Sequence, residues 1–202
     1  MRKKSRLVFG VGVNDSELPV YKYKDRILVW QCQFYRAWNN MLKRCYSTEL
    51  MLRHPTYIGC SVDPEWIYFS AFRSWMQSKD WDGMHLDKDI LFPGNKMYSP
   101  DTCIFVSPAL NIFLIDRGLD RGEWPIGVCW HKNVGGFTAN CSNPFTGQRD
   151  HLGVFSSPDD AHEAWRRRKH QHALRYADMQ TDPRIAEALR TRFAKQPTNG
   201  SE

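Results

Sequence analysis

The stretch HLDKDILFPGNKMYSPDTCIFV, residues 85–106, decides how the first half of the chain is interpreted. Apolar residues flank an interior that contains a histidine, carboxylates, an asparagine and the pair Gly94-Asn95. A glycine beside an asparagine is typical of a tight turn between two strands. We therefore predict a strand, a turn near Gly94 and a second strand, which together form a candidate metal or phosphate site.

Three chemically active side chains, His85, Asp87 and Asp89, follow one another at alternate positions of this stretch. Alternation in a strand puts all three on one face. Neutral histidine can take a proton from water, and carboxylate oxygens bind hard cations. These residues, with Asn111, form a candidate site for Mg²⁺ or Mn²⁺, and Lys96 could meet a phosphate across the turn. The alternative is a solvated hairpin edge that Asn111 caps or braces.

The remainder of the first half shows helical periodicity. Residues 1–25 mix basic residues, glycines and a proline, which predicts a basic N-terminal arm. Apolar positions at helical spacing predict a helix over residues 33–45 and a second helix that starts after Asp63-Pro64 and ends before Asp80. A short helix is expected over residues 108–114, and a domain boundary is expected at residues 117–122.

The second half changes to short strands. Three strand-like runs, residues 126–131, 136–141 and 150–155, predict a three-stranded antiparallel sheet. Ser157-Pro158 with two following aspartates predicts the start of a helix that continues to Tyr176. A last helix over residues 183–193 precedes a polar end that we expect to be disordered. The fold class is therefore α+β.

Composition points to a polyanionic partner. The formal net charge is +6, and aromatic residues make up 13% of the chain. This combination favours duplex DNA, although a mildly basic surface on a soluble protein is the alternative. No apolar run approaches the roughly 20 residues that a membrane span needs, so we expect no membrane association and no signal peptide.

The six cysteines are scattered and form no C-x-x-C pair. Reduced, mostly buried thiols are the expectation. The alternative is a structural Zn²⁺ site that uses Cys45, Cys60 and Cys103 with a histidine.

Residues 125–176 resemble the DNA-binding domain of plant ethylene-response factors, the APETALA2-like domain. The matching segments, in order, are Ile126-Gly127-Val128, Gly136-Phe137-Thr138-Ala139, Arg149, His151-Leu152-Gly153-Val154-Phe155 and Ser157 to Trp165. The resemblance implies a sheet that enters the major groove with a helix packed behind it. By position, Cys129, His131 and Arg149 stand where sheet residues would face DNA, with Trp130 and Lys132 nearby. On the helix, Arg166 and Arg167 would add phosphate contacts if the helix end lies close to the DNA backbone; the alternative is a solvated face behind the sheet.

The first half resembles the phage HNH homing endonucleases in a degenerate form. Its segments are His85-Leu86-Asp87, Gly94-Asn95-Lys96, Tyr98-Ser99 and Cys103-Ile104. The resemblance implies a ββα-metal-like hairpin in which His85 and Asp87 are catalytic and a divalent metal assists hydrolysis of duplex DNA. Residues 88–93 lengthen the turn, and two expected asparagines are replaced.

The two resemblances together give the expected organisation: a basic arm (1–25), an HNH-like domain (26–120), a three-stranded DNA-binding domain (121–178) and a C-terminal helix with a tail (179–202). They imply a homing endonuclease in the cytoplasm of a phage-infected bacterial cell. The alternative is a DNA-binding regulator or inhibitor on a nuclease-derived scaffold that no longer cuts. The sequence does not fix the oligomeric state.

Overall fold

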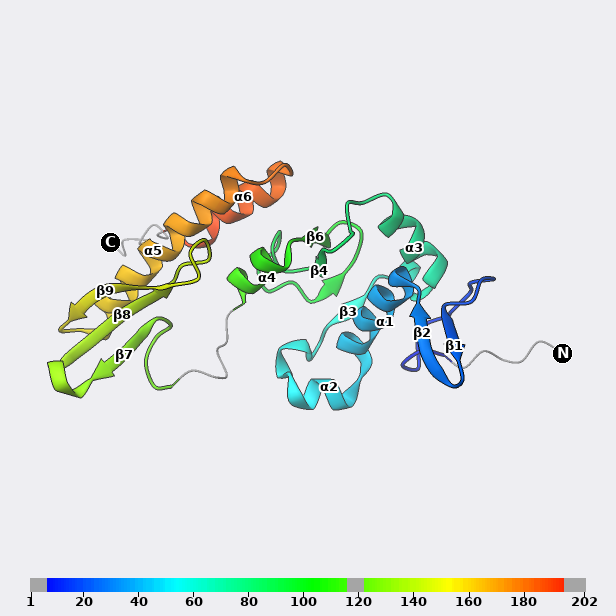
Figure 1. Cartoon of the computed structure of the whole chain (residues 1–202), viewed down its shortest axis with the longest axis horizontal. Helices are drawn as coiled ribbons and strands as arrows, with labels where there is room; N and C mark the ends of the chain where they lie inside the picture. Colours follow the sequence, from blue (N-terminus) through cyan, green and yellow to red (C-terminus); the bar gives the residue numbers. More distant parts are fainter. Residues whose placement is uncertain (1–6, 116–121, 195–202) are drawn as a thin grey trace, which may run out of the picture. The chain divides into compact units, whose positions relative to one another are not determined.

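The computed structural model describes residues 7–115 and 122–194. Short helices and small sheets alternate along the chain, which confirms the mixed α+β class (Figure 1). The chain forms two compact units, residues 1–108 and residues 109–202. This division precedes the boundary expected at residues 117–122, most of which lie outside the described residues. Within the described ranges, no helix combines the length and the apolar character needed to cross a membrane.

The first unit is built from short elements around one longer helix. In chain order they are β1 (Tyr21–Lys24), β2 (Ile27–Gln31), α1 (Gln33–Tyr46), α2 (Thr48–Arg53), η1 (Pro55–Tyr57), β3 (Ser61–Val62), η2 (Pro64–Ile67), α3 (Phe69–Gln77), β4 (His85–Asp87), β5 (Met97–Tyr98) and β6 (Ile104–Val106). The helix predicted over residues 33–45 is confirmed as α1. The helix expected after Asp63-Pro64 is divided into η2 and α3.

The core of the first unit forms around Trp38 of α1, which is fully buried. Its indole Nε1 donates a hydrogen bond of 2.7 Å to the carbonyl oxygen of Trp66 in η2, so the one polar group of the ring is satisfied inside the core. Phe69 and Phe72 of α3 complete the same apolar cluster. The helical spacing of apolar residues in α1 therefore marks the face that packs on α3 in the core.

The segment expected to form a basic arm is part of this unit from its first described residues. Val8 pairs with Gly12, Val13 pairs with Tyr68, and β1 pairs with β2. Gly12 lies so close to α1 that an added Cβ would stand 2.3 Å from Leu42. The expectation of a loosely held arm is wrong for residues 7–25, because their scattered apolar residues pack on α1 without showing a regular period. Residues 1–6 lie outside the described residues.

The predicted hairpin at residues 85–106 is confirmed only in its outer part. Strands β4 and β6 pair antiparallel, with His85 opposite Val106 and Asp87 opposite Ile104. Strand β5 does not pair with β4 or β6; it pairs in parallel with β3. The segment between Asp87 and Ile104 is therefore a long internally braced loop. It contains the turn predicted near Gly94, where the backbone N–H of Asn95 donates to the carbonyl oxygen of Phe92 (3.0 Å) and Gly94 has φ +79°, but this turn does not join β4 directly to β6.

The second unit contains α4 (Pro108–Leu114, which starts at the boundary), β7 (Val128–His131), η4 (Lys132–Val134), β8 (Gly136–Ser142), β9 (Arg149–Phe155), α5 (Pro158–Asp178) and α6 (Pro183–Arg192). Its three strands and helix α5 match their prediction, but the unit also includes α4, which was expected in the first domain, and α6, which was expected outside the second. The strands form one antiparallel sheet in the order β7-β8-β9. Helix α5 packs across one face of this sheet (Figure 1).

Helix α5 begins where the sequence predicted. The Ser157 hydroxyl accepts a hydrogen bond from the backbone N–H of Asp160, and Pro158 occupies the first turn, where no N–H is needed. Carboxylates in the same turn oppose the positive end of the helix dipole. The cap fixes the point at which the chain leaves β9 and crosses the sheet.

We predict that Gly127→Ala destabilises the second unit strongly. Gly127 has φ +83°, and an added Cβ would stand 2.1 Å from Cδ1 of Trp165. Overpacking should cost about 1–3 kcal/mol, and the positive φ about 1 kcal/mol more. Gly135→Ala is the matched control, because Gly135 also has a positive φ but nothing lies within 4 Å of its added Cβ. Equal losses of unfolding free energy in urea for the two variants would contradict the packing argument.

Candidate functional site

The first candidate site starts on β4, where His85 is exposed and Asp87 is half-buried. The Oδ1 atom of Asp87 accepts hydrogen bonds from the backbone N–H groups of Asp89 (2.8 Å) and Ile90 (2.7 Å). This side-chain turn ends the strand at Asp87, since it bends the following backbone back onto the carboxylate. The predicted strand face therefore holds His85 and Asp87 but not Asp89.

Lys88 is buried, with 5% of its surface exposed. Its ammonium lies 2.7 Å from both carboxylate oxygens of Asp89 and 2.5 Å from the carbonyl oxygen of Asn95. The ring of Tyr98 lies below it, with its centroid 5.7 Å from Nζ. A buried ammonium is tolerated only when its charge and its N–H donors are satisfied, and this pocket supplies both.

Asn95 braces the opposite side of the same loop. Its amide nitrogen donates to the carbonyl oxygens of Lys88 (3.0 Å) and Met97 (2.6 Å), and its amide oxygen accepts from the backbone N–H of Met97 (3.0 Å). Lys96, expected to meet a phosphate, remains exposed and donates to the carbonyl oxygen of Thr56. The Gly94-Asn95 pair therefore shapes a loop around Lys88.

The carboxylates do not form a shared metal site in this arrangement. Asp87 uses one oxygen to hold two backbone N–H groups, and Asp89 directs both oxygens to an ammonium. Across residues 7–115 and 122–194, no three or more His, Cys, Asp or Glu side chains are grouped to hold a metal ion. The proposed ligand Asn111 lies on α4, in the other unit. The described groups thus do not fit the expected Mg²⁺ or Mn²⁺.

The zinc alternative also lacks support. Cys45, Cys60 and Cys103 are buried, and Cys45 lies near enough to the other two for their charges to interact. Burial raises the pKa of the Cys45 thiol to about 12 and that of Cys103 to about 12. Within the described residues, these thiols do not group with one another or with a histidine in a way that could hold a metal ion. All six cysteines are free thiols, and these three serve as small core residues.

A polar groove of about 470 Å³ borders His85 in the first unit. Helix α1 contributes Arg36, Asn40 and Arg44, which are spaced four residues apart and so share one face. Burial acts to lower the pKa of Arg44, but Tyr98, Tyr57 and Asp87 raise it above its ordinary value. The four-residue spacing of these polar side chains is visible in the sequence, but it does not by itself predict a groove.

The second candidate site is the face of the β7-β8-β9 sheet opposite α5. Asp150 marks the covered face, since it contacts Arg168 and His172 of α5. Alternation and register then place a different set of side chains on the open face. They are Cys129, His131, Thr138, Asn140, Ser142, Arg149, His151 and the exposed apolar residue Val154.

Two contacts between strands confirm this assignment of faces. The Cys129 sulfur lies 2.9 Å from the Thr138 hydroxyl, and Nδ1 of His151 lies 3.3 Å from the amide oxygen of Asn140. His131, Arg149 and His151 are exposed. The open face therefore presents hydrogen-bonding groups from all three strands.

The remaining predicted DNA contacts lie elsewhere on the second unit. Trp130 packs on Phe137 with ring centroids 4.9 Å apart, which places it on the covered face, although its edge is exposed. Lys132 is exposed in η4 beside the open face. Arg166 binds Glu163 and the carbonyl oxygen of Phe193, and Arg167 approaches Glu163 at 4.0 Å. Both arginines lie on α5, behind the sheet.

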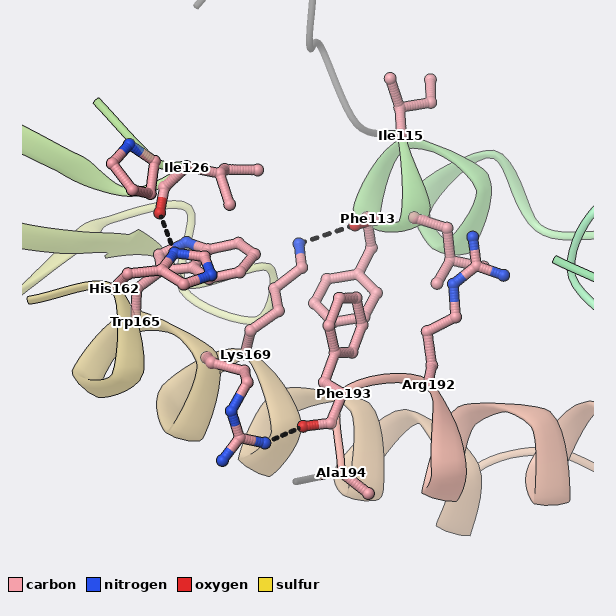
Figure 2. Close-up of a pocket in the computed structure, with 12 residues that line it drawn as sticks. Phe113, Ile115, Ile126, His162, Trp165, Lys169, Arg192, Phe193 and Ala194 are labelled. Carbon is pink, nitrogen blue, oxygen red and sulfur yellow. Dashed lines mark hydrogen bonds between the residues drawn. The ribbon is translucent and has the colours of Figure 1, made fainter. Parts of the chain in front are cut away.

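Figure 2 shows a cavity of about 460 Å³ in the second unit, where α5 meets the ends of α4 and α6. Lys169 of α5 donates to the carbonyl oxygen of Phe113 (2.7 Å), and Arg166 donates to that of Phe193 (2.5 Å). Both carbonyls belong to the last turn or the cap of a helix, where no intrahelical partner is available. Burial lowers the pKa of Lys169. These cations therefore join the helices of this unit.

We predict that Lys88→Met destabilises the first unit by about 1–3 kcal/mol, because it leaves the Asp89 carboxylate and the Asn95 carbonyl without their donor. Lys96→Met removes the same charge from an exposed position nearby and should cost under about 0.5 kcal/mol. Urea unfolding followed by tryptophan fluorescence measures both. A Lys88 variant as stable as the Lys96 variant would show that the buried contacts carry no net stability.

Comparison of the chain with protein-family models, with curated proteins and with solved structures found no match. The HNH and ethylene-response-factor resemblances therefore rest on the motifs quoted above.

Proposed function

We propose that this protein binds duplex DNA through the open face of the β7-β8-β9 sheet. The observation that carries the proposal is the set of exposed polar side chains opposite α5, with Arg149, His131 and His151 on the outer strands. Helix α5 holds the sheet from behind, so its open face can meet a partner without rearrangement. The chain's net charge of +6 favours a polyanion.

The chemistry of this face suits base edges as well as phosphates. The major groove is about 12 Å wide and admits a narrow sheet or ribbon. Arginine can donate two hydrogen bonds to guanine, and an asparagine amide can pair with adenine. Arg149 and Asn140 offer these groups on neighbouring strands. Lys132 lies next to the same face and can contact a phosphate.

For the first unit, the geometry favours the non-cutting regulator over the endonuclease. The Lys88 ammonium already neutralises Asp89, and Asp87 holds the backbone of its own loop. These contacts support a first unit in which protein groups, in place of a divalent cation, hold the loop after β4. As a regulator of this kind, the protein would act in the cytoplasm of a phage-infected bacterial cell, where its DNA partner lies.

We expect fluorescence anisotropy with a random-sequence duplex to show binding whose log affinity falls as log salt rises. Arg149→Ala should lower the slope of that salt dependence by about 1 if Arg149 contacts a phosphate. If it pairs with guanine instead, the variant should lose about 1–3 kcal/mol on the preferred sequence alone. Arg190→Ala is the control, because Arg190 lies on α6 beside Asp178. No DNA binding by the wild type would overturn the proposal.

A second candidate function, DNA cleavage, is favoured by one observation. The exposed His85 borders the same groove as Arg36, so a proton acceptor and a phosphate-binding cation line one cavity. Because the described carboxylates do not fit a metal ion, we derive no metal-dependent step from this arrangement.

The cleavage candidate predicts that supercoiled plasmid is nicked or linearised, and parallel reactions in Mg²⁺, Mn²⁺ and EDTA show whether a divalent cation is needed. His85→Ala should then reduce the rate by a factor on the order of 10²–10⁴ without a change in DNA affinity, since a proton acceptor acts on water and not on groove contacts. His54→Ala is a matched control, because His54 is also exposed in the first unit but does not line the groove. Intact plasmid in both metals, with tight binding, would leave only the regulator.

A further inference from the structure

We infer that the β1–β2 ribbon of the first unit is a second duplex-DNA contact, an inference that rests on the proposed function. The two strands form an antiparallel hairpin that turns at Asp25 and Arg26, both with positive φ (Figure 1). Every residue from Lys22 to Trp30 is exposed, although five of them are aromatic or aliphatic. Within the described part of the unit, this ribbon is therefore left uncovered.

The base of the ribbon is fixed to the core. The Tyr21 ring packs edge-on against Tyr35 of α1 at 5.3 Å, and the backbone N–H of Cys32 donates to the carbonyl oxygen of Val20 at 2.9 Å. Beyond this anchor, Ile27 is 68% exposed and Val29 is 59% exposed. A ribbon held at its base and open at its tip loses little conformational freedom on binding.

One face of the ribbon combines cations with an aromatic ring. Lys22 pairs across the ribbon with Trp30, and Lys24 pairs with Ile27, so these four side chains share a face. The Lys22 ammonium lies 5.2 Å from the Trp30 ring centroid. The opposite face carries Tyr23 beside Tyr21. Basic and flat side chains on one surface suit phosphates together with sugars or bases.

The positive charge of the ribbon favours DNA over a second copy of the chain as its partner. The ribbon carries Lys22, Lys24 and Arg26 against the single carboxylate of Asp25, and in the part of the chain that the structure describes none of the three cations forms an ion pair. A two-fold interface between copies would place these cations opposite one another. Duplex DNA instead offers phosphates on both walls of a groove that admits a two-stranded ribbon.

The test uses the full chain and a random-sequence duplex over a series of salt concentrations. The double variant Lys22→Gln/Lys24→Gln should weaken binding on the order of ten-fold and lower the slope of log affinity against log salt by about 2. Lys43→Gln/Lys79→Gln is the charge-matched control, because both residues are exposed in the first unit outside the ribbon. Thermal unfolding should be the same for both variants.

The outcomes separate the two proposals. Absence of wild-type DNA binding would overturn the proposed function and this inference with it. Wild-type binding with equal affinity and equal salt slope in both double variants would overturn the ribbon contact alone. Sedimentation that shows a dimer dispersed by Ile27→Ser/Val29→Ser, with DNA binding unchanged, would assign the ribbon to a second copy and equally overturn the inference.

Discussion

The buried ammonium of Lys88 constrains the part of the chain on which both functional interpretations of the first unit depend. Its contacts with Asp89 and with the Asn95 carbonyl pull the loop after β4 inward. With the loop in this position, β5 pairs with β3 and the side chain of Tyr98 is buried in the core. Asp87 and Tyr98 in turn lie near Arg44 of α1. Arg44 lines the groove beside His85, so the residues around Lys88 are connected to this groove through Arg44.

Elements with a local cause could be predicted from the sequence. Helix α1 follows the spacing of its apolar residues, and α5 follows the Ser157 cap with its proline and acids. The three strands of the second unit are separated in the sequence by short segments of turn-forming residues. In each case, residues a few positions apart determine both the type and the ends of the element.

Features outside these patterns were predicted wrongly or missed. Strand alternation would have placed Asp89 beside His85, but the carboxylate of Asp87 ends the strand first. The position of Trp130 in the sequence predicted a contact with the DNA groove, whereas its ring packs on Phe137 of the neighbouring strand. The segment 7–25 lacks a period because it contacts α1 and η2 at separate points. The Asp87 turn is local, because its hydrogen bonds reach only two and three residues along the chain, whereas tertiary packing decides the other placements.

A basic composition does not by itself identify the residues that can meet a polyanion. Lys88, Lys169 and Arg166 contribute to the net charge. Each of them, however, donates hydrogen bonds to carbonyl or carboxylate groups inside its own unit. Phosphate contact with any of them would first break those bonds, and the acceptors left behind would lose their partners. Cations on exposed strands, such as Lys22, Lys24 and Arg149, incur no such loss. Of the basic residues discussed, those on exposed strands are therefore the better candidates for DNA contacts in both units.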